Sequence, residues 1–153
     1  MSHHAPLRVE IQSIEVDMVS KSPIVILSVP DRSRVFSLWV GIFEANGIAV
    51  ELERMVPPRP MTHDLLKNAI QALGGSISRV AITDFRDDVF FATVYIEYAG
   101  RMVFVDARPS DAFALALRAG APIFVDSAVL DEITTFPDIE TMRLASFTSE
   151  DVN

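Results

Sequence analysis

A strand gives way directly to a helix at Val105-Asp106-Ala107-Arg108-Pro109-Ser110-Asp111. The residues from position 101 to the first aspartate are rich in β-branched and aromatic side chains, as strands are. Proline is favoured at the first position of a helix, and apolar residues follow it until Gly120 and Pro122 stop the pattern. The segment therefore predicts a strand over residues 101–106 and a short apolar helix from Pro109 to about Arg118.

This strand and helix have a counterpart earlier in the chain. Sliding the sequence by 67 places sets residues 34–52 against residues 101–119, and it sets Glu44 against Asp111. Each half then carries an acidic residue in the first turn of a helix that directly follows a strand, where the helix dipole favours negative charge.

The remaining elements complete two copies of one unit. Apolar or alternating runs predict strands over residues 8–17, 23–29 and 34–40 in the first copy, and over 77–84, 89–98 and 101–106 in the second. Between the copies, Thr62 is the expected N-cap of a further helix that Gly74-Gly75 ends. We therefore predict an α+β fold, a single compact domain whose mixed sheets come from a duplicated strand-strand-strand-helix unit.

Length and composition set the class of protein. A chain of 153 residues can bury one core without disulfides, and we assign the domain to residues 1–134 and a loosely packed or disordered tail to residues 135–153. Because 50% of the residues are hydrophobic, we expect part of the apolar surface to be buried in a homo-oligomer, with a dimer favoured. No apolar run approaches the roughly 20 residues of a membrane span, no signal peptide is visible and cysteine is absent, so we expect a cytoplasmic protein with no membrane partner.

The net charge of −8 disfavours a broad basic face for nucleic acid. A role on RNA or DNA therefore requires a local site, which carboxylates holding a divalent cation would provide by reversing the local field. The chain has no P-loop, dinucleotide-binding glycine pattern, nucleophile elbow or histidine-rich metal motif. The common nucleotide-binding, hydrolase and zinc enzymes are therefore disfavoured.

Asp106, Arg108 and Asp111 form the main candidate site. Two acids that flank an arginine at a helix start make a compact place to bind a phosphate or a metal ion. The structural alternative is that Ser110 or Asp111 accepts hydrogen bonds from the free helix amides while Arg108 pairs with Asp106.

A second candidate begins in the rigid loop Pro57-Pro58-Arg59-Pro60. Arg59 is suited to bind phosphate, and His63 beside Asp64 is suited to proton transfer near neutral pH. The alternative is a capped helix start with an exposed histidine. Of the other acids, Asp84 ends an apolar strand and needs a partner, Glu44 matches Asp111, and Asp87 and Asp88 are assigned to a turn. Trp39 is expected to pack in the core or at a subunit interface.

Four separated motifs, in this order, resemble the bifunctional nuclease domain family. They are Trp39-Val40-Gly41-Ile42-Phe43-Glu44-Ala45, Pro57-Pro58-Arg59-Pro60-Met61-Thr62-His63-Asp64-Leu65-Leu66, Thr83-Asp84 and Val105-Asp106-Ala107-Arg108-Pro109-Ser110-Asp111-Ala112. The resemblance covers about residues 8–132. It implies a mixed α/β domain with a duplicated strand and helix unit, in a family to whose plant members DNase and RNase activity is attributed. It supplies no catalytic residue set, so each role is assigned from the chemistry of the motif residue itself.

Two hypotheses follow. The first is a nuclease acting on RNA and/or DNA, with Asp106, Arg108, Asp111 and His63 as catalytic residues and Arg59 or Arg108 binding the phosphate. Its cofactor would be Mg²⁺ or Mn²⁺ held by some of Asp84, Asp106, Asp111 and Glu44. The second is a non-enzymatic oligomeric module for binding or regulation, in which the same residues form a structural lattice. Convergence of these side chains on one cleft would favour the nuclease, and dispersal would favour the module.

Overall fold

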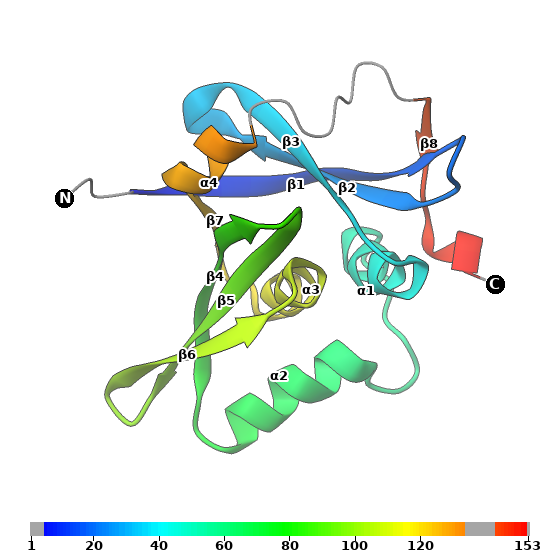
Figure 1. The fold of residues 1–153 in the computed structure, drawn as a ribbon. Helices are drawn as coiled ribbons and strands as arrows, with labels where there is room; N and C mark the ends of the chain where they lie inside the picture. Colours follow the sequence, from blue (N-terminus) through cyan, green and yellow to red (C-terminus); the bar gives the residue numbers. More distant parts are fainter. Residues whose placement is uncertain (1–4, 134–142, 153) are drawn as a thin grey trace.

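The computed structural model describes residues 5–133 and 143–152 and has the predicted duplicated order (Figure 1). The first copy comprises β1 (Pro6–Asp17), β2 (Pro23–Val29), β3 (Arg34–Trp39) and α1 (Ile42–Leu52). The second comprises β4 (Ser76–Arg86), β5 (Val89–Tyr98), β6 (Arg101–Ala107) and α3 (Pro109–Ala119). The offset of 67 places carries the bounds of α1 onto those of α3, so the predicted repeat is confirmed at the level of whole elements.

The strands form one mixed sheet. Its order is β3-β2-β1-β7-β4-β5-β6, where β7 is Ile123–Asp126, and β8 (Leu144–Ser146) also pairs with β1. The β4–β7 pair is parallel and the other pairs are antiparallel. The long strand β1 joins the two copies, because its residues 6–9 pair with β7 and its residues 10–16 pair with β2. The predicted α+β class is confirmed.

The core lies between this sheet and the pair α1 and α3, which lie side by side in Figure 1. Ile48 of α1 and Phe113 of α3 are fully buried. Helix α2 (Thr62–Ala72) lies below α3 in Figure 1 and has no buried residue. Because burial of apolar side chains is the main stabilising term in folding, α2 depends more than α1 and α3 on polar contacts.

Three short elements extend the sequence-based picture. Helix α4 (Ser127–Glu132) follows β7, and two 3-10 helices lie at Pro30–Arg32 (η1) and Ser149–Val152 (η3). Within the segment predicted as a tail, β8 is paired with β1 and Phe147 is buried; residues 134–142 and 153 lie outside the described residues. Among the described residues, no helix has the length and apolar character of a membrane span.

The N-cap prediction for α2 was off by one residue. Thr62 is the first helical residue and Met61 occupies the cap position. Asp64, the third residue of the helix, caps it by accepting a hydrogen bond of 2.8 Å from the backbone N–H of Met61. Asp64 thereby fixes the first turn, which also carries His63.

Candidate active site

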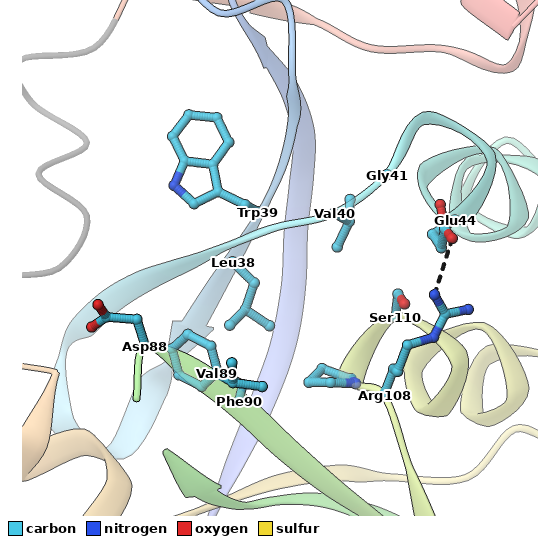
Figure 2. A pocket seen from close by; sticks show the side chains of 11 residues that line it. Leu38, Trp39, Val40, Gly41, Glu44, Asp88, Val89, Phe90, Arg108 and Ser110 are labelled. Carbon is cyan, nitrogen blue, oxygen red and sulfur yellow. Dashed lines mark hydrogen bonds and ion pairs between the residues drawn. The ribbon is translucent and has the colours of Figure 1, made fainter. Parts of the chain in front are cut away.

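The site is built around Arg108, at the junction of β6 and α3. Arg108 is the N-cap residue of α3, with extended backbone angles, and Pro109 begins the helix. Its Nε donates to Asp111 at 2.9 Å, and its Nη1 donates to Glu44, in the first turn of α1, at 3.1 Å (Figure 2). Arg108 therefore joins the starts of the two duplicated helices.

The alternative pairing of Arg108 with Asp106 was wrong. Residues three apart on a helix start share one face, so Asp111 lies within reach of the Arg108 guanidinium. Asp106 is still part of β6, and its exposed carboxylate has no hydrogen-bond or ion-pair partner among the described residues. The expected cap by Ser110 or Asp111 was also wrong, because α3 has no side-chain cap hydrogen bond. Asp111 is held by Arg108 and His63 instead, and Asp106 is left without a structural contact.

His63 extends the contacts of Asp111 to α2. Its Nε2 lies 2.9 Å from Asp111 Oδ1, and its side chain is only 16% exposed. The ring rests against α1 at Gly47, where an added Cβ would lie 3.3 Å from Cε1 and Nδ1 of His63. We call Glu44, Arg108, Asp111 and His63 the charge chain; it links all three large helices.

Arg108 and Asp111 of the charge chain are both ionised at neutral pH. Partial burial raises the pKa of Asp111, but hydrogen bonds from Arg108 and His63 outweigh it, so the pKa lies below its ordinary value. The hydrogen bond and the charge of Asp111, together with Glu44, raise the pKa of Arg108 further. Arg108 is therefore a permanent cation held between two carboxylates.

The four predicted catalytic residues line one cleft. We call it the α2 cleft; it has a volume of about 410 Å³ and lies between α2 and strands β5 and β6. Its polar lining residues are Thr62, His63, Asp106, Arg108 and Asp111, and its remaining lining residues are apolar, Leu66, Ile70, Val94, Ile96, Val105, Ala107 and Leu115. A mostly apolar cavity with a few convergent polar groups is the usual form of a small-molecule or substrate site.

The other predicted residues lie elsewhere. Glu44 is on the far side of Arg108 and lines a separate hollow (Figure 2). Asp84 is paired with Arg86 at 2.7 Å near the end of β4. Arg59 lies in the loop before α2, in a depression shared with Asp64. The side chains that the sequence put forward therefore separate, and the convergent set is the smaller one around Arg108.

The metal prediction rests on Asp106 alone. Among residues 5–133 and 143–152, no three His, Asp or Glu side chains are grouped to hold a metal ion. Glu44 and Asp111 accept from Arg108, and Asp84 accepts from Arg86. Mg²⁺ often uses one or two carboxylates with water and substrate phosphates, and Asp106 fits that mode. Binding of Mg²⁺ or Mn²⁺ stays a prediction.

Arg118 is an important residue that the sequence analysis passed over. Its side chain is 1% exposed, and its Nε donates to Asp64 at 2.9 Å. Its Nη1 donates to the carbonyls of Gly47 and Ala114 at 2.8 and 2.9 Å. The same hydrogen bond and charge lower the pKa of Asp64, together with the Met61 N–H and against the effect of burial. Arg118 thus holds α1, α2 and α3 together beneath the charge chain.

The repeat contained a signal for this contact. The offset of 67 places sets Glu51 against Arg118 and Gly47 against Ala114, and Glu51 Oε1 lies 3.8 Å from Arg118 Nε. Arg118 therefore bonds the carbonyls of two residues that are equivalent in the repeat. An acid opposite a base at matched positions of two packed helices was the available clue.

Comparison with known proteins places these residues in a family. The model of the bifunctional nuclease domain matches residues 25–138. An uncharacterized protein of Mycobacterium tuberculosis strain H37Rv is 40% identical over 122 residues, which cover 80% of this chain and 73% of that protein. The chain belongs to the bifunctional nuclease domain family. Its N-cap arginine, the paired aspartate and the α2 histidine all fall inside the matched region.

A more distant relative is named as a nuclease. Bifunctional nuclease 1 of Oryza sativa subsp. indica is 28% identical over 75 residues, which cover 47% of this chain and 23% of that protein. The similarity to the rice protein is thus limited to part of each chain. It supports membership of the bifunctional nuclease domain family.

Proposed function

We propose that this protein is a nuclease that hydrolyses phosphodiester bonds in RNA and/or DNA at the α2 cleft. The observation that carries the proposal is that an unpartnered carboxylate, Asp106, and an exposed cation, Arg108, line the same cleft without contacting each other. Family membership and the name of the rice relative support the same class of reaction. The fold alone would not, since one fold serves many activities.

Arg108 is the phosphate-binding group in this proposal. Its side chain is 65% exposed, and two of its three nitrogens are directed to Glu44 and Asp111. The third nitrogen, Nη2, has no partner among the described residues and is free to donate to a phosphate oxygen. Because the guanidinium is already oriented, binding phosphate costs little reorganisation, and its charge stabilises the negative charge of the transition state.

Asp106 is the residue that would hold Mg²⁺ or Mn²⁺, together with water and phosphate oxygens. When bound, the ion would neutralise charge on the phosphoryl group and make a bound water more acidic. Asp106 sits at the end of a paired strand, opposite Thr93 of β5, so its backbone is held in place. A carboxylate on a rigid element is suited to this task because its position does not have to be ordered on binding.

His63 has a positioning role in the proposal. Its Nε2 contacts Asp111, and Cε1 and Nδ1 face α1 at Gly47. His63 thereby holds the carboxylate that in turn orients Arg108. Proton transfer by His63 stays a prediction from the sequence, and a His63→Gln variant separates the two roles, because glutamine keeps a donor to Asp111 but cannot carry the proton.

The test is cleavage of labelled RNA and single-stranded DNA by purified protein with Mg²⁺ or Mn²⁺. We expect EDTA to stop cleavage and Asp106→Asn to lower it by about 100-fold or more while the circular dichroism spectrum is unchanged. Asp87→Asn, in the exposed β4–β5 turn, is the matched control and should cleave like wild type. Equal degradation by wild type and Asp106→Asn would mean that a contaminant is the nuclease.

A second candidate function is that of an oligomeric module, which one observation favours. Strand β6 ends the sheet and pairs only with β5 among the described strands. Its side chains Val103, Phe104 and Val105 are 36%, 66% and 42% exposed. Exposed apolar edge strands invite pairing with another strand, and a second copy of β6 in antiparallel orientation would set Phe104 of each copy opposite the other.

The oligomeric state tests this second candidate. We expect light scattering after size exclusion to give a dimer for wild type and a monomer for Phe104→Glu, because two carboxylates would then meet at the twofold axis. Val56→Glu is the control, since Val56 is 93% exposed in the loop before α2. A wild-type monomer at high protein concentration would exclude pairing through β6.

A further inference from the structure

The open edge of β6 lacks the features that keep an edge strand from pairing with another copy. Its residues, Arg101–Ala107, pair with β5 without a β-bulge, and they include no lysine or proline. Natural proteins usually protect an exposed edge with such residues or with a bulge. The centre of this edge instead exposes three successive apolar side chains, Val103, Phe104 and Val105. Leu66 of α2, which lines the α2 cleft with Val105, is 45% exposed as well.

The turn before β6 determines which backbone groups are free at this edge. Both residues of the turn 99–100 have positive φ, as in the two-residue turns that close a β-hairpin on a hydrogen-bonded pair. Arg101 belongs to that pair, so its N–H and C=O are directed to β5. Because this direction alternates along a strand, the N–H and C=O groups of Met102, Phe104 and Asp106 are directed away from β5. These three residues can therefore pair with a further strand.

One register pairs the whole of β6 with an antiparallel second copy of itself. It sets Phe104 opposite the partner's Phe104 and Met102 opposite the partner's Asp106, so that all seven residues of the strand are paired. The backbone groups that are free in each copy then bond to one another. Any other register leaves part of β6 unpaired, and a register centred on Asp106 would set two carboxylates opposite each other. The strand is thus complementary to itself about a twofold axis at Phe104.

This register brings Arg101 of one copy to the α2 cleft of the other. Arg101 and Ala107 are the two ends of β6, so Arg101 lies opposite the partner's Ala107. Side chains alternate between the faces of a strand, which places Arg101 on the same face as Val105 and Ala107, two lining residues of the α2 cleft. Residues directly opposite each other have Cβ atoms about 4.5–5.5 Å apart. The long side chain of Arg101 therefore reaches the partner's cleft, where Arg108 follows Ala107.

We propose that two copies pair through β6 and that each completes the other's α2 cleft with Arg101. The proposal rests on the proposed nuclease function and adds a phosphate-binding residue to it. Each end of the interface holds one cation, Arg101, and one carboxylate, Asp106, from different copies, so the two surfaces are complementary in charge. Arg108 binds the phosphate that is cleaved, and Arg101 of the partner subunit binds a neighbouring phosphate of the strand. A second cation matters because the chain carries a net charge of −8, which repels a polyanion.

Cysteine cross-linking tests the register without any measurement of activity. The chain has no cysteine, so each single variant carries one thiol. In the proposed dimer the two Cα atoms at position 104 are about 5.5 Å apart, within the range of a disulfide, and the two at position 103 or 105 are about 7–8 Å apart. We expect Phe104→Cys to form a covalent dimer under mild oxidation, and Val103→Cys and Val105→Cys to stay monomeric on a denaturing gel. Cross-linking through position 103 or 105 in place of 104, or through none, would overturn the pairing.

Mixed dimers test whether Arg101 acts on the partner's site. An Asp106→Asn chain and an Arg101→Ala chain with different tags are co-expressed, and the heterodimer is purified through both tags. If Arg101 acts across the interface, one cleft of this heterodimer has both defects and the other has none. We expect about half of the wild-type cleavage rate, against about 1% for the Asp106→Asn dimer and about 10% for the Arg101→Ala dimer. The monomeric Phe104→Glu chain should lose as much activity as Arg101→Ala.

Arg32→Ala is the matched control, since Arg32 is an exposed arginine of η1, between β2 and β3. It should cleave like wild type. An Arg101→Ala dimer that also cleaves like wild type would refute the role of Arg101. A heterodimer no more active than the mean of its two homodimers would refute action across the interface.

The outcomes also separate this inference from the nuclease proposal. If Phe104→Cys cross-links but wild type cleaves neither RNA nor DNA, the β6 dimer stands, and the nuclease function and the shared site both fail. If wild type cleaves as a monomer, or the heterodimer does not recover activity, the nuclease function stands and the shared site fails.

Discussion

The two copies of the repeated unit begin their helices with nearly the same backbone and very different side chains. Gly41 before α1 has φ −72° and ψ 163°, and Arg108 before α3 has φ −70° and ψ 145°. The offset of 67 places sets Trp39 against Asp106 and Gly41 against Arg108. The first copy therefore has an aromatic residue and a glycine where the second has an acid and a base. The two copies share one frame, and the two charged residues that the proposed chemistry needs are present only in the second copy.

A glycine is needed at position 41 because of the nearby Glu44 side chain, and not because of its backbone angles. Its φ is negative, so any residue could adopt it, but an added Cβ would clash with Glu44 Oε2. Glycine lets Glu44 fold back over the helix start and reach Arg108 of the other copy. The small residue of one copy thus makes room for the charge pair of the other.

The strongest disruption of the frame should come from Arg118→Met. Arg118 bonds equivalent carbonyls of both copies and the carboxylate of Asp64, and the change leaves Asp64 half-buried without its cation. We expect a loss of about 3 kcal/mol and a fall of Tm by about 10 °C in thermal unfolding. Arg101→Met on the surface is the control and should unfold like wild type. A stable Arg118→Met protein would show that the two copies do not depend on this contact.

Replacing Arg108 by alanine should make the second copy resemble the first. We expect cleavage to fall by about 100-fold and stability by no more than about 1 kcal/mol, because the pairs with Glu44 and Asp111 are exposed to solvent. Arg86→Ala is a matched control, since Arg86 is also an exposed arginine paired with an aspartate. Equal losses of activity in the two variants would remove the special role of Arg108.

Gly41→Ala should break the link between the copies more gently. The added methyl group displaces Glu44 from Arg108, and we expect a loss of about 1 kcal/mol in urea unfolding. On a Glu44→Ala background the same change should cost almost nothing, because the clashing carboxylate is gone. If Gly41→Ala costs the same with and without Glu44, the steric explanation of the glycine is wrong.

The smallest expected effect is on the acid dependence of stability. The folded pKa of Asp111 lies below the ordinary value of 3.8, so its contribution to stability is present above that value and is lost as pH falls through the folded pKa. Below about pH 4, Tm of wild type should therefore fall more steeply than Tm of Asp111→Asn. Parallel curves of Tm against pH for the two proteins would mean that Asp111 gains no net stabilisation from Arg108 and His63.

The repeat made most of the fold predictable. The matched segments 34–52 and 101–119 predicted where α1 and α3 lie, because local signals mark a strand-to-helix junction. These signals are Pro109 and the helical spacing of the apolar residues. Strand β7 and helix α4 were missed because each is short and depends on pairing or packing with distant residues. Short segments carry too little periodicity to be recognised alone.

The candidate site was predictable only in part, because Glu44, Arg59 and Asp84 lie outside the cleft and the connections between its members could not be predicted. His63, Asp106, Arg108 and Asp111 do line one cleft. The partner of Arg108 could not be read from the sequence, since Glu44 is 64 residues away and Asp106 is nearer in the chain. Trp39 was expected in the core or at a subunit interface because tryptophan is usually buried. Its 39% exposure shows that it is not buried in the core, and the interface stays a prediction.

The division of labour between the two copies is tested most directly by cleavage kinetics of Asp106→Asn and Trp39→Ala measured side by side. Asp106→Asn should lower kcat by about 100-fold or more with little change in KM, and Trp39→Ala should keep kcat and KM within about twofold of wild type, because Trp39 does not line the α2 cleft. Cleavage at the wild-type rate by Asp106→Asn, or a loss of kcat in Trp39→Ala as large as that in Asp106→Asn, would contradict the assignment of the chemistry to the second copy.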